Sequence, residues 1–562
     1  MIVRLDKAGP RNLRSDVCIV GAGPAGIVLA LELARQKHTV TLLESGFFAH
    51  HPDTQSLADA AVYDTRRHAP MHLATRRQLG GTSALWGGRC VPLDPIDLSA
   101  RPHVANGGWP IGFDALAKHY PAACAYAGCG RADFKSQSAL PGRQASIVPA
   151  LPDEDILSST LERWASSTDL GQRYRAQLES STRITLVLGA TCTSINFEGT
   201  AHETSSLTAR SLSGGQLSVE AATYILAAGG LETTRLLLHS DSAHTGGVGN
   251  HSGKLGRYYM GHISGKIAEV HFQTPPRDTI SGFERDASGM YCRKRFTVSA
   301  EAQQRHKLLN CAFWLDNPRI HDAAHGNGIL SFAYLALSTP VISRRLAPEA
   351  IRASATGSGG TGGTNIWPHF CNVMKELPAV AGFIPWFGYN RFLAKRRIPG
   401  FFLHNRNNIY ALHYHAEHAP DSASRVFLSD KADAHGVRRL NVDLRYHAQD
   451  VDSVMRSHRL LDEHLRQNRV GKLHYKSITY NTSILDQASD GFHQLGTTRM
   501  TTDADQGVVD ANCRVHGVSN LFVCSSAVFA TSGQANPTLT IIALAVRLAQ
   551  YLHTHQLSPI AV

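Results

Sequence analysis

The sequence predicts an α/β fold in which a Rossmann-like domain with a mainly parallel sheet is joined to a second domain with an antiparallel sheet and flanking helices. Two observations predict it. A strand, glycine turn, helix and second strand follow one another from Asp16 to Glu44, as in a right-handed β-α-β unit. From about 266 to 489 the pattern changes to alternating segments such as Asn408–His415, which are typical of antiparallel strands.

The individual elements follow from short apolar runs and their periods. Asp16–Val20 and Thr39–Leu43 read as buried parallel strands, and Ile27–Gln36 between them as a helix. Further elements are expected as strands at 183–197, 216–219 and 222–228, and as helices at 448–467 and 538–552. Residues 355–364, rich in Gly, Ser and Thr, predict a flexible loop.

The glycine turn predicts dinucleotide binding. Gly21 permits a tight turn, Gly23 lets the backbone approach a pyrophosphate, and Gly26 lets the helix pack closely on the strand. The helix N-terminus offers free N–H groups to phosphates. Glu44 ends the second strand at the spacing expected for an acid that binds ribose hydroxyls, which disfavours a 2′-phosphate and hence NADP. The turn alone does not separate FAD from NAD.

Composition narrows the class of protein. The net charge of +11 and the pI of about 9.2 suit a large globular protein, and basic runs with interleaved aromatics are missing, so we expect no nucleic-acid partner. Ten scattered cysteines without a C-x-x-C pair favour reduced thiols in a cytoplasmic protein. The first residues lack a signal-peptide pattern, and no apolar run reaches the ~18–20 residues of a membrane span.

Several longer motifs resemble the glucose-methanol-choline (GMC) family of flavin oxidoreductases, and the nearest branch looks like the pyranose oxidases and bacterial sugar-oxidising members. The motifs follow the family order along nearly the whole chain, except in the loosely matching segment 266–489. They are Gln78–Arg89, Gly108–Tyr120, Val248–His262, His493–Met500, Val515–Phe522 and Gln534–Thr540. The resemblance implies that the dinucleotide is FAD.

The resemblance also implies a catalytic pair. The histidine of the family's H-x-x-G-T motif falls on His493, and its second His-or-Asn position falls on Asn536. The chemistry suits these residue types. An imidazole, with an ordinary pKa of ~6.5, can remove the hydroxyl proton of an alcohol while hydride leaves carbon for flavin N5. An amide can bind the same oxygen without competing as a base.

We expect the cofactor to contact a set of residues spread over the chain. Leu85 falls where some relatives carry a histidine that bonds to FAD, so the resemblance implies non-covalent FAD. The usual acidic residue of the C-terminal motif falls on Ser525, so no flavin contact is assigned there. The expected set is Gly21, Gly23, Ala25, Gly26, Glu44, Gly81, Thr82, Ser83, Trp86, Gly87, Cys192, Ala228, Gly229, Ser526, Asn536, Pro537 and Thr538.

With the resemblance, the chain divides as follows. Residues 1–265 are expected to form the FAD-binding domain, with a loop and substrate-side portion near 100–180. Residues 266–489 form the substrate-binding domain, and 490–562 complete the FAD domain and carry the catalytic pair. Trp86 and Trp109 are interpreted mainly as packing residues, with lining of the flavin pocket as the alternative for both.

The predicted function is FAD-dependent oxidation of a CH–OH group on a sugar, glycoside or hydroxylated natural product, with His493 as base. Oxygen, a quinone or a redox protein takes up the electrons. An alternative is a flavin-binding protein of non-redox type, a lyase or isomerase that uses the same pocket. An NAD-dependent dehydrogenase ranks third. Substrate identity, the electron acceptor and the oligomeric state stay open at this point.

Two further segments receive a structural interpretation. His413, His415 and His418 form a metal-like cluster without a further ligand, so we predict a polar strand face and turn, and no metal site. Residues 383–402 combine aromatic side chains with a basic triplet. A lid or loop packed on the substrate domain is the favoured interpretation, and peripheral contact with an anionic membrane is the alternative.

Overall fold

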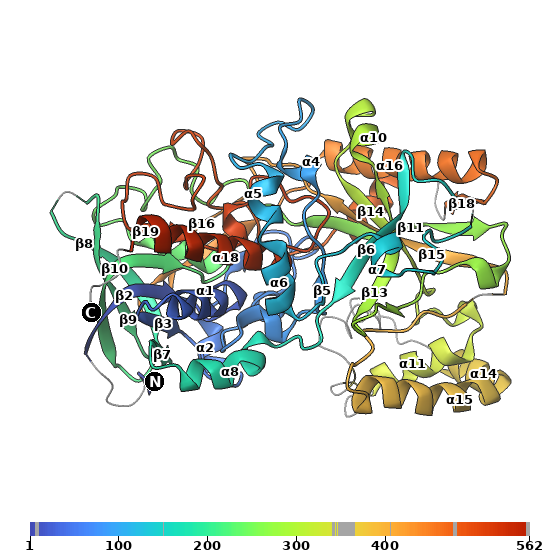
Figure 1. Cartoon of the computed structure of the whole chain (residues 1–562), viewed down its shortest axis with the longest axis horizontal. Coiled ribbons are helices and arrows are strands. Elements are labelled where there is room, and N and C mark those ends of the chain that lie inside the picture. The colour runs from blue at the N-terminus through green and yellow to red at the C-terminus, as the bar shows by residue number, and fades with distance from the viewer. Residues whose placement is uncertain are drawn as a thin grey trace.

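The computed structural model describes residues 1–5, 11–149, 151–199, 201–339, 343, 346, 366–404, 406–475 and 480–557. The predicted loop at 355–364 lies outside these ranges. Two sheet-based lobes stand side by side, with both termini in the lobe at the left of Figure 1. Among the described helices, none is both long and apolar enough to pass through a bilayer.

The first sheet is mainly parallel, as predicted. Within the described residues it has eight strands in the order β1-β7-β3-β2-β10-β9-β8, and β19 pairs with β10. Only the β10-β9 and β9-β8 pairs are antiparallel. The strands are β1 (Ile2–Arg4), β2 (Asn12–Val20), β3 (Val40–Glu44), β7 (Ile184–Leu188), β8 (Thr191–Phe197), β9 (Thr204–Arg210), β10 (Gln216–Leu226) and β19 (Leu521–Val523).

Apolar strands explain why this sheet is covered on its faces. Every residue of β3 is buried, and so are the last four residues of β2. Helix α1 (Pro24–Arg35) follows the glycine turn and packs against α18 (Thr538–His555), which in turn packs against α6 (Tyr120–Ala127). The first and last helices of the lobe therefore lie together, as Figure 1 shows.

Two predicted strand boundaries are wrong. The run 183–197 is two strands, because Gly189 takes a φ of +71° and turns the chain between β7 and β8. The runs 216–219 and 222–228 are one strand, β10, because it pairs with β9 at its start and with β2 along most of its length. Glu220 and Ala221 stay in the ladder, because Arg14 and Ser15 of β2 pair with them.

The second sheet is antiparallel, and Asn408–His415 lies in it as predicted. Its order is β18-β11-β15-β14-β13-β6-β5, with β12 paired to β13. Helix α16 spans Ala448–Gln467, the predicted range, and packs on β18 and β6. The strands are β5 (Arg89–Cys90), β6 (Ile156–Trp164), β11 (His262–Phe272), β12 (Glu284–Arg285), β13 (Tyr291–Val298), β14 (Cys311–Asp316), β15 (Ile409–Glu417) and β18 (Gly471–Tyr475).

The remaining elements are short or lie at the edges. A small sheet has the order β16-β17-β4. Its strands are β4 (Ala61–Val62), β16 (Arg425–Ala432) and β17 (Arg438–Asp443). The other helices are α2 (Pro52–Ser56), α3 (Met71–Ala74), η1 (Gly81–Ala84), α4 (Pro95–Leu98), α5 (Phe113–Ala117), α7 (Ser136–Ala139), α8 (Leu170–Ser180), α9 (Gly230–His239), η2 (Pro276–Asp278), α10 (Ala300–Arg305), η3 (Ala323–His325), α17 (Tyr480–Gln487) and η5 (Ser526–Val528).

A separate helical layer carries part of the segment interpreted as a lid or loop. It consists of α11 (Gly328–Ser338), α14 (Trp367–Lys375), α15 (Leu377–Gly388) and the π-helical turn η4 (Tyr389–Leu393). Residues 383–393 are therefore helical, so a simple loop is wrong there. Pro385 lies inside α15, although a proline normally disfavours the interior of a helix. Figure 1 shows the layer at the lower right.

Candidate active site

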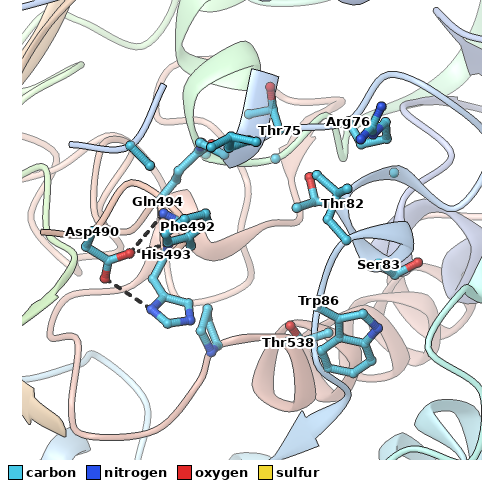
Figure 2. A pocket seen from close by; sticks show the side chains of 18 of the residues that line it. Thr75, Arg76, Thr82, Ser83, Trp86, Asp490, Phe492, His493, Gln494 and Thr538 are labelled. Carbon is cyan, nitrogen blue, oxygen red and sulfur yellow. Dashed lines mark hydrogen bonds and ion pairs between the residues drawn. The ribbon is translucent and has the colours of Figure 1, made fainter. Parts of the chain in front are cut away.

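A cavity of about 1460 Å³ lies between the two sheets. The first sheet contributes residues such as Val20 and Leu43, and the second contributes Ser264 and Trp314. Figure 2 shows Asp490 and His493 on one side and Thr82, Ser83 and Trp86 across from them. This volume exceeds the ~300–1,000 Å³ of a site for one drug-sized ligand, so there is room for a dinucleotide and a substrate together.

The glycine turn has three different steric roles. Gly21 has a φ of +98°, and a Cβ there would lie 2.8 Å from the Ala227 carbonyl oxygen. A Cβ on Gly26 would lie 1.8 Å from the Gly21 oxygen, so this glycine allows the helix to pack on the turn. A Cβ on Gly23 would meet no atom within 4 Å, and Gly23 lines the cavity. Space for a ligand therefore lies directly beside Gly23.

Glu44 is held rigidly where β3 ends at the cavity. Its Oε2 accepts a hydrogen bond from Ala22 N at 3.0 Å, and its Oε1 accepts one from Gly46 N at 2.7 Å. Burial raises the pKa of this carboxyl, while the two backbone donors and nearby Arg77 oppose the shift. Glu44 thereby also fixes the glycine turn against the end of the second strand.

The structure brings the expected cofactor residues to this one cavity. Gly26 is the exception, because it lies against Gly21 and lines no part of it. Leu85 and Ser525 also line the cavity. Trp109 instead packs on Phe529 in the core. The expected residues on the cavity wall are Gly21, Gly23, Ala25, Glu44, Gly81, Thr82, Ser83, Trp86, Gly87, Cys192, Ala228, Gly229, Ser526, Asn536, Pro537 and Thr538.

His493 and Asn536, which lie 43 positions apart in the sequence, meet at the cavity. Asn536 Nδ2 is 2.9 Å from His493 Nε2, and the His493 side chain is 19% exposed. Asn536 Oδ1 is buried and has no hydrogen-bond partner among the described residues. Because an amide nitrogen donates and an imidazole lone pair accepts, His493 Nε2 is assigned as the unprotonated nitrogen.

Asp490 fixes the other side of the imidazole. Its Oδ2 lies 3.1 Å from His493 Nδ1, and its Oδ1 accepts from the backbone N–H groups of Phe492 and His493. Gly491, with a φ of +103°, completes this turn, which passes so close to His68 that a Cβ would clash. Since a carboxylate only accepts, His493 Nδ1 carries the proton.

The charge state of Asp490 supports this assignment. Burial alone would raise the pKa of its carboxyl, but the positive charge that His493 can carry and hydrogen bonds from His262 and His493 hold that pKa well below its usual range. The backbone N–H of His262 also donates to Oδ2 at 2.6 Å. Asp490 is therefore an ionised, fully hydrogen-bonded carboxylate at neutral pH.

Two more histidines surround His493. The His262 ring stacks on His415 with centroids 4.3 Å apart, and both rings meet His493 edge-on. Burial lowers the pKa of His262 to about 4 and that of His415 well below its ordinary value. His415 Nδ1 donates to the Gln534 carbonyl at 2.7 Å. Both rings are therefore neutral and closely packed at pH 7, and they exclude water from this side of His493.

The prediction of a polar strand face is wrong for His415, which is buried on β15, and His418 just after the strand is buried too. His262, His415 and His493 offer ring nitrogens within 4.8 Å of one another, a spacing that could suit a metal ion. Both nitrogens of His493, however, lie within hydrogen-bond distance of protein side chains. We therefore interpret the cluster as a hydrogen-bonded network.

Beyond His493 the cavity wall becomes polar and aromatic. Trp314 stacks on His413 with ring centroids 4.3 Å apart, and the Arg89 guanidinium lies over the Trp314 ring, 4.3 Å from its centroid. Lys266 and Asp316 form an ion pair of 2.7 Å, and both line the cavity. The charged donor and acceptor on this wall suit a compact ligand with several hydroxyl groups.

Comparison with known families agrees with this geometry. A family model described as FAD dependent oxidoreductase matches residues 16–244, which include the glycine turn. A second model, described as GMC oxidoreductase, matches residues 420–545, which include His493 and Asn536. Residues 420–545 therefore form a GMC oxidoreductase domain. The chain is an FAD-dependent oxidoreductase, so the cofactor and fold class expected from the motifs are confirmed.

Two of the similar proteins cover nearly the whole chain, and a third covers a short part of it. The 2-methyl-1,2-propanediol dehydrogenase of Mycolicibacterium austroafricanum is 22% identical over 623 residues, which cover 96% of this chain and 95% of that protein. The C-glycoside 3-oxidase of Arthrobacter globiformis is 37% identical over 97 residues, or 17% of this chain and 18% of that protein. A formate oxidase structure, 17% identical, superposes with a TM-score of 0.53 and covers 97% and 99% of the two chains.

The cavity of this oxidoreductase fits FAD. A Cβ on Gly23, Gly87 or Gly229 would meet no atom within 4 Å, so these backbones leave room for a ligand along the cavity wall. The N-termini of α1 and α18 both border the cavity through Pro24 and Thr538, and such termini favour phosphate groups. When bound, FAD supplies a two-electron acceptor for hydride.

Proposed function

We propose that this GMC oxidoreductase oxidises a CH–OH group with His493 as the base. The observation that carries the proposal is the pairing of His493 Nε2 and Asn536 Nδ2 at 2.9 Å on the cavity wall. A substrate hydroxyl that reaches both nitrogens from the cavity replaces their direct contact: it donates its proton to His493 Nε2 and accepts a hydrogen bond from Asn536 Nδ2. Asp490 holds the Nδ1 proton, so the positive charge that develops on the imidazole is stabilised.

The polar wall supports a polyhydroxylated substrate, a sugar, glycoside or hydroxylated natural product. Lys266 and Asp316 offer a donor and an acceptor for hydroxyl groups on this wall. The names of the propanediol dehydrogenase and the C-glycoside 3-oxidase agree with a CH–OH donor. We further propose that FAD is held non-covalently, because Leu85 has no nucleophile where an attachment is expected.

Anaerobic titration of the purified flavoprotein tests this function. Sugars, glycosides and simple diols are added in turn, and loss of the visible flavin band is recorded. We expect bleaching with at least one polyhydroxylated compound and none with its fully O-methylated counterpart, which has no proton for His493 to remove. A product that forms without any bleaching would contradict the proposal. Acid precipitation should release the flavin into the supernatant.

The electron acceptor is proposed to be oxygen, a quinone or a redox protein. Steady-state turnover with each acceptor distinguishes an oxidase from a dehydrogenase. We also propose a cytoplasmic location, which the ten cysteines support because all of them are free thiols and eight are buried. Fractionation of the source cells tests this location.

A further inference from the structure

Exposed apolar side chains gather on one surface of the protein. Among the described residues, only four large hydrophobic side chains are exposed outside the helical layer of α11, α14, α15 and η4, namely Met1, Tyr63, Leu212 and Phe492. Ten more lie on the helical layer, which Figure 1 shows at one outer end of the molecule. They are Ile366, Trp367, Phe370, Met374, Leu377, Ile384, Trp386, Tyr389, Phe392 and Leu393. We call this set the apolar platform. So many exposed apolar side chains on one helical layer mark a surface that something apolar covers.

Helix α14 buries polar side chains and exposes apolar ones, the reverse of an ordinary surface helix. Its buried residues are His369 and Asn372, and its exposed ones include Trp367, Phe370 and Met374. Asn372 Nδ2 donates to the Ala323 carbonyl at 2.9 Å, and His369 contacts Ser331. The polar side chains are therefore satisfied within the protein, while the apolar ones face outward. A helix on a water-facing surface normally has the opposite arrangement.

Helix α15 adds to the same surface. It has no charged side chain between Leu377 and Gly388, and Val380 is its one buried residue. A helix that is apolar on all sides is normally enclosed by protein or lipid. The chain segment at 347–365 is rich in Gly, Ser and Thr, a composition that would contribute little apolar area as a cover.

The charges around the apolar platform select the partner. Residues 366–400 contain five basic residues and one acid, Glu376. Glu376 is engaged with the protein, because its Oε2 accepts from Gly328 N at 2.7 Å. Lys375 precedes α15, and Lys395 and Arg397 follow it in the sequence. All three are exposed. Tryptophan and tyrosine next to basic residues suit the boundary between acyl chains and anionic headgroups.

We propose that the apolar platform docks on an anionic lipid surface. Helix α15 lies in the plane of the interface, the aromatic side chains enter the headgroup region, and the basic residues bind phosphate groups of the lipids. Because none of the described helices has the length and apolar character to span a bilayer, this attachment is to one face of the membrane. The proposal does not depend on the reaction at His493.

Vesicle co-sedimentation of the FAD-loaded protein tests docking. We expect binding to vesicles of phosphatidylcholine with phosphatidylglycerol at low salt, and at least tenfold weaker partitioning to phosphatidylcholine alone. Leu377→Glu together with Trp386→Glu should weaken partitioning at least tenfold. Leu212→Glu is the matched control, because Leu212 is 43% exposed and Leu377 47%. Lys395→Glu with Arg397→Glu should remove the preference for the anionic lipid.

Further readouts keep the proposal falsifiable. All variants should retain FAD and an unchanged thermal midpoint, since the altered side chains are exposed. Absence of vesicle binding, or equal binding of the Leu377→Glu/Trp386→Glu variant, would overturn the proposal. A protein that sediments as a dimer, becomes monomeric in that variant and ignores vesicles would show that a second copy covers the platform. A His493→Ala variant should still bind vesicles, so docking and chemistry are tested separately.

Discussion

Asp490 Oδ2 lies 3.1 Å from His493 Nδ1, three residues along the chain and on the far side of the imidazole from Asn536. The carboxylate thus sets which nitrogen of His493 is protonated, and Asn536 marks the nitrogen that is free to accept. Four groups donate hydrogen bonds to the Asp490 oxygens: the backbone N–H groups of His262, Phe492 and His493, and the His493 ring.

Asp490→Asn should slow flavin reduction roughly tenfold to hundredfold, less than loss of the base itself. Either orientation of the new amide turns its NH₂ group toward N–H donors, so the imidazole loses its fixed tautomer. Stopped-flow reduction across pH 5 to 9 measures this. A merely structural role would lower the yield of folded protein and leave the pH profile of the folded fraction unchanged. An unaltered profile at unaltered rate would therefore reject the positioning role.

Asn536→Asp should slow flavin reduction more than Asn536→Ala does. A carboxylate at 2.9 Å from Nε2 attracts a proton to that nitrogen and so blocks it as the acceptor, whereas alanine merely removes a hydrogen bond. We expect roughly a tenfold loss for alanine and a larger loss for aspartate, measured as the anaerobic reduction rate with saturating substrate. The reverse order would mean that Asn536 does not contact the reacting hydroxyl.

Two glycine substitutions separate cofactor binding from folding. Gly23→Ala places a methyl group in open cavity space, at a φ of −80° that alanine tolerates, so the protein should fold but bind FAD at least ~10-fold more weakly. Gly26→Ala forces a contact with the Gly21 oxygen and should lower stability as well. Flavin content and thermal midpoint of the apoprotein are the readouts. Equal FAD affinity in Gly23→Ala and wild type would place the cofactor elsewhere.

His458 makes the fold sensitive to acid. It is fully buried on α16, and burial lowers its pKa to about 4 from the ordinary value of 6.5. Between about pH 6.5 and pH 4, His458 is protonated in the unfolded chain and neutral in the native protein. The free energy of unfolding therefore falls as the pH drops through this window. From pH 7 to pH 5 the wild type should lose about 2 kcal/mol more free energy of unfolding than His458→Gln. Urea unfolding at both pH values measures this difference, and parallel losses would contradict it.

Features of the fold that depend on the local sequence were predicted better than those that depend on long-range contacts. Gly21–Gly26 with Glu44, α16 and α18 follow from the spacing of neighbouring residues, and these predictions agree with the structure closely. Strand boundaries such as that of β10 were missed, because the partner strands β9 and β2, rather than the local sequence, decide how far it extends.

The network around His493 was predicted only in part. His493 and Asn536 were found through family motifs, whereas Asp490, His262 and His415 were not. The D-x-x-H spacing of Asp490 was the one available signal, and it is weak without the turn that Gly491 makes. His262 and His415 come from β11 and β15, whose pairing no short-range pattern reveals. The helical character of α15, with Pro385 inside it, was not predicted.

The most direct test of the central claim is the anaerobic rate of flavin reduction in His493→Ala, measured with the substrate that bleaches the wild type. The account predicts that this variant keeps its full complement of FAD and reduces it at least ~100-fold more slowly, because the hydroxyl proton has lost its acceptor. Reduction at the wild-type rate in a fully FAD-loaded variant would contradict the assignment of His493 as the base.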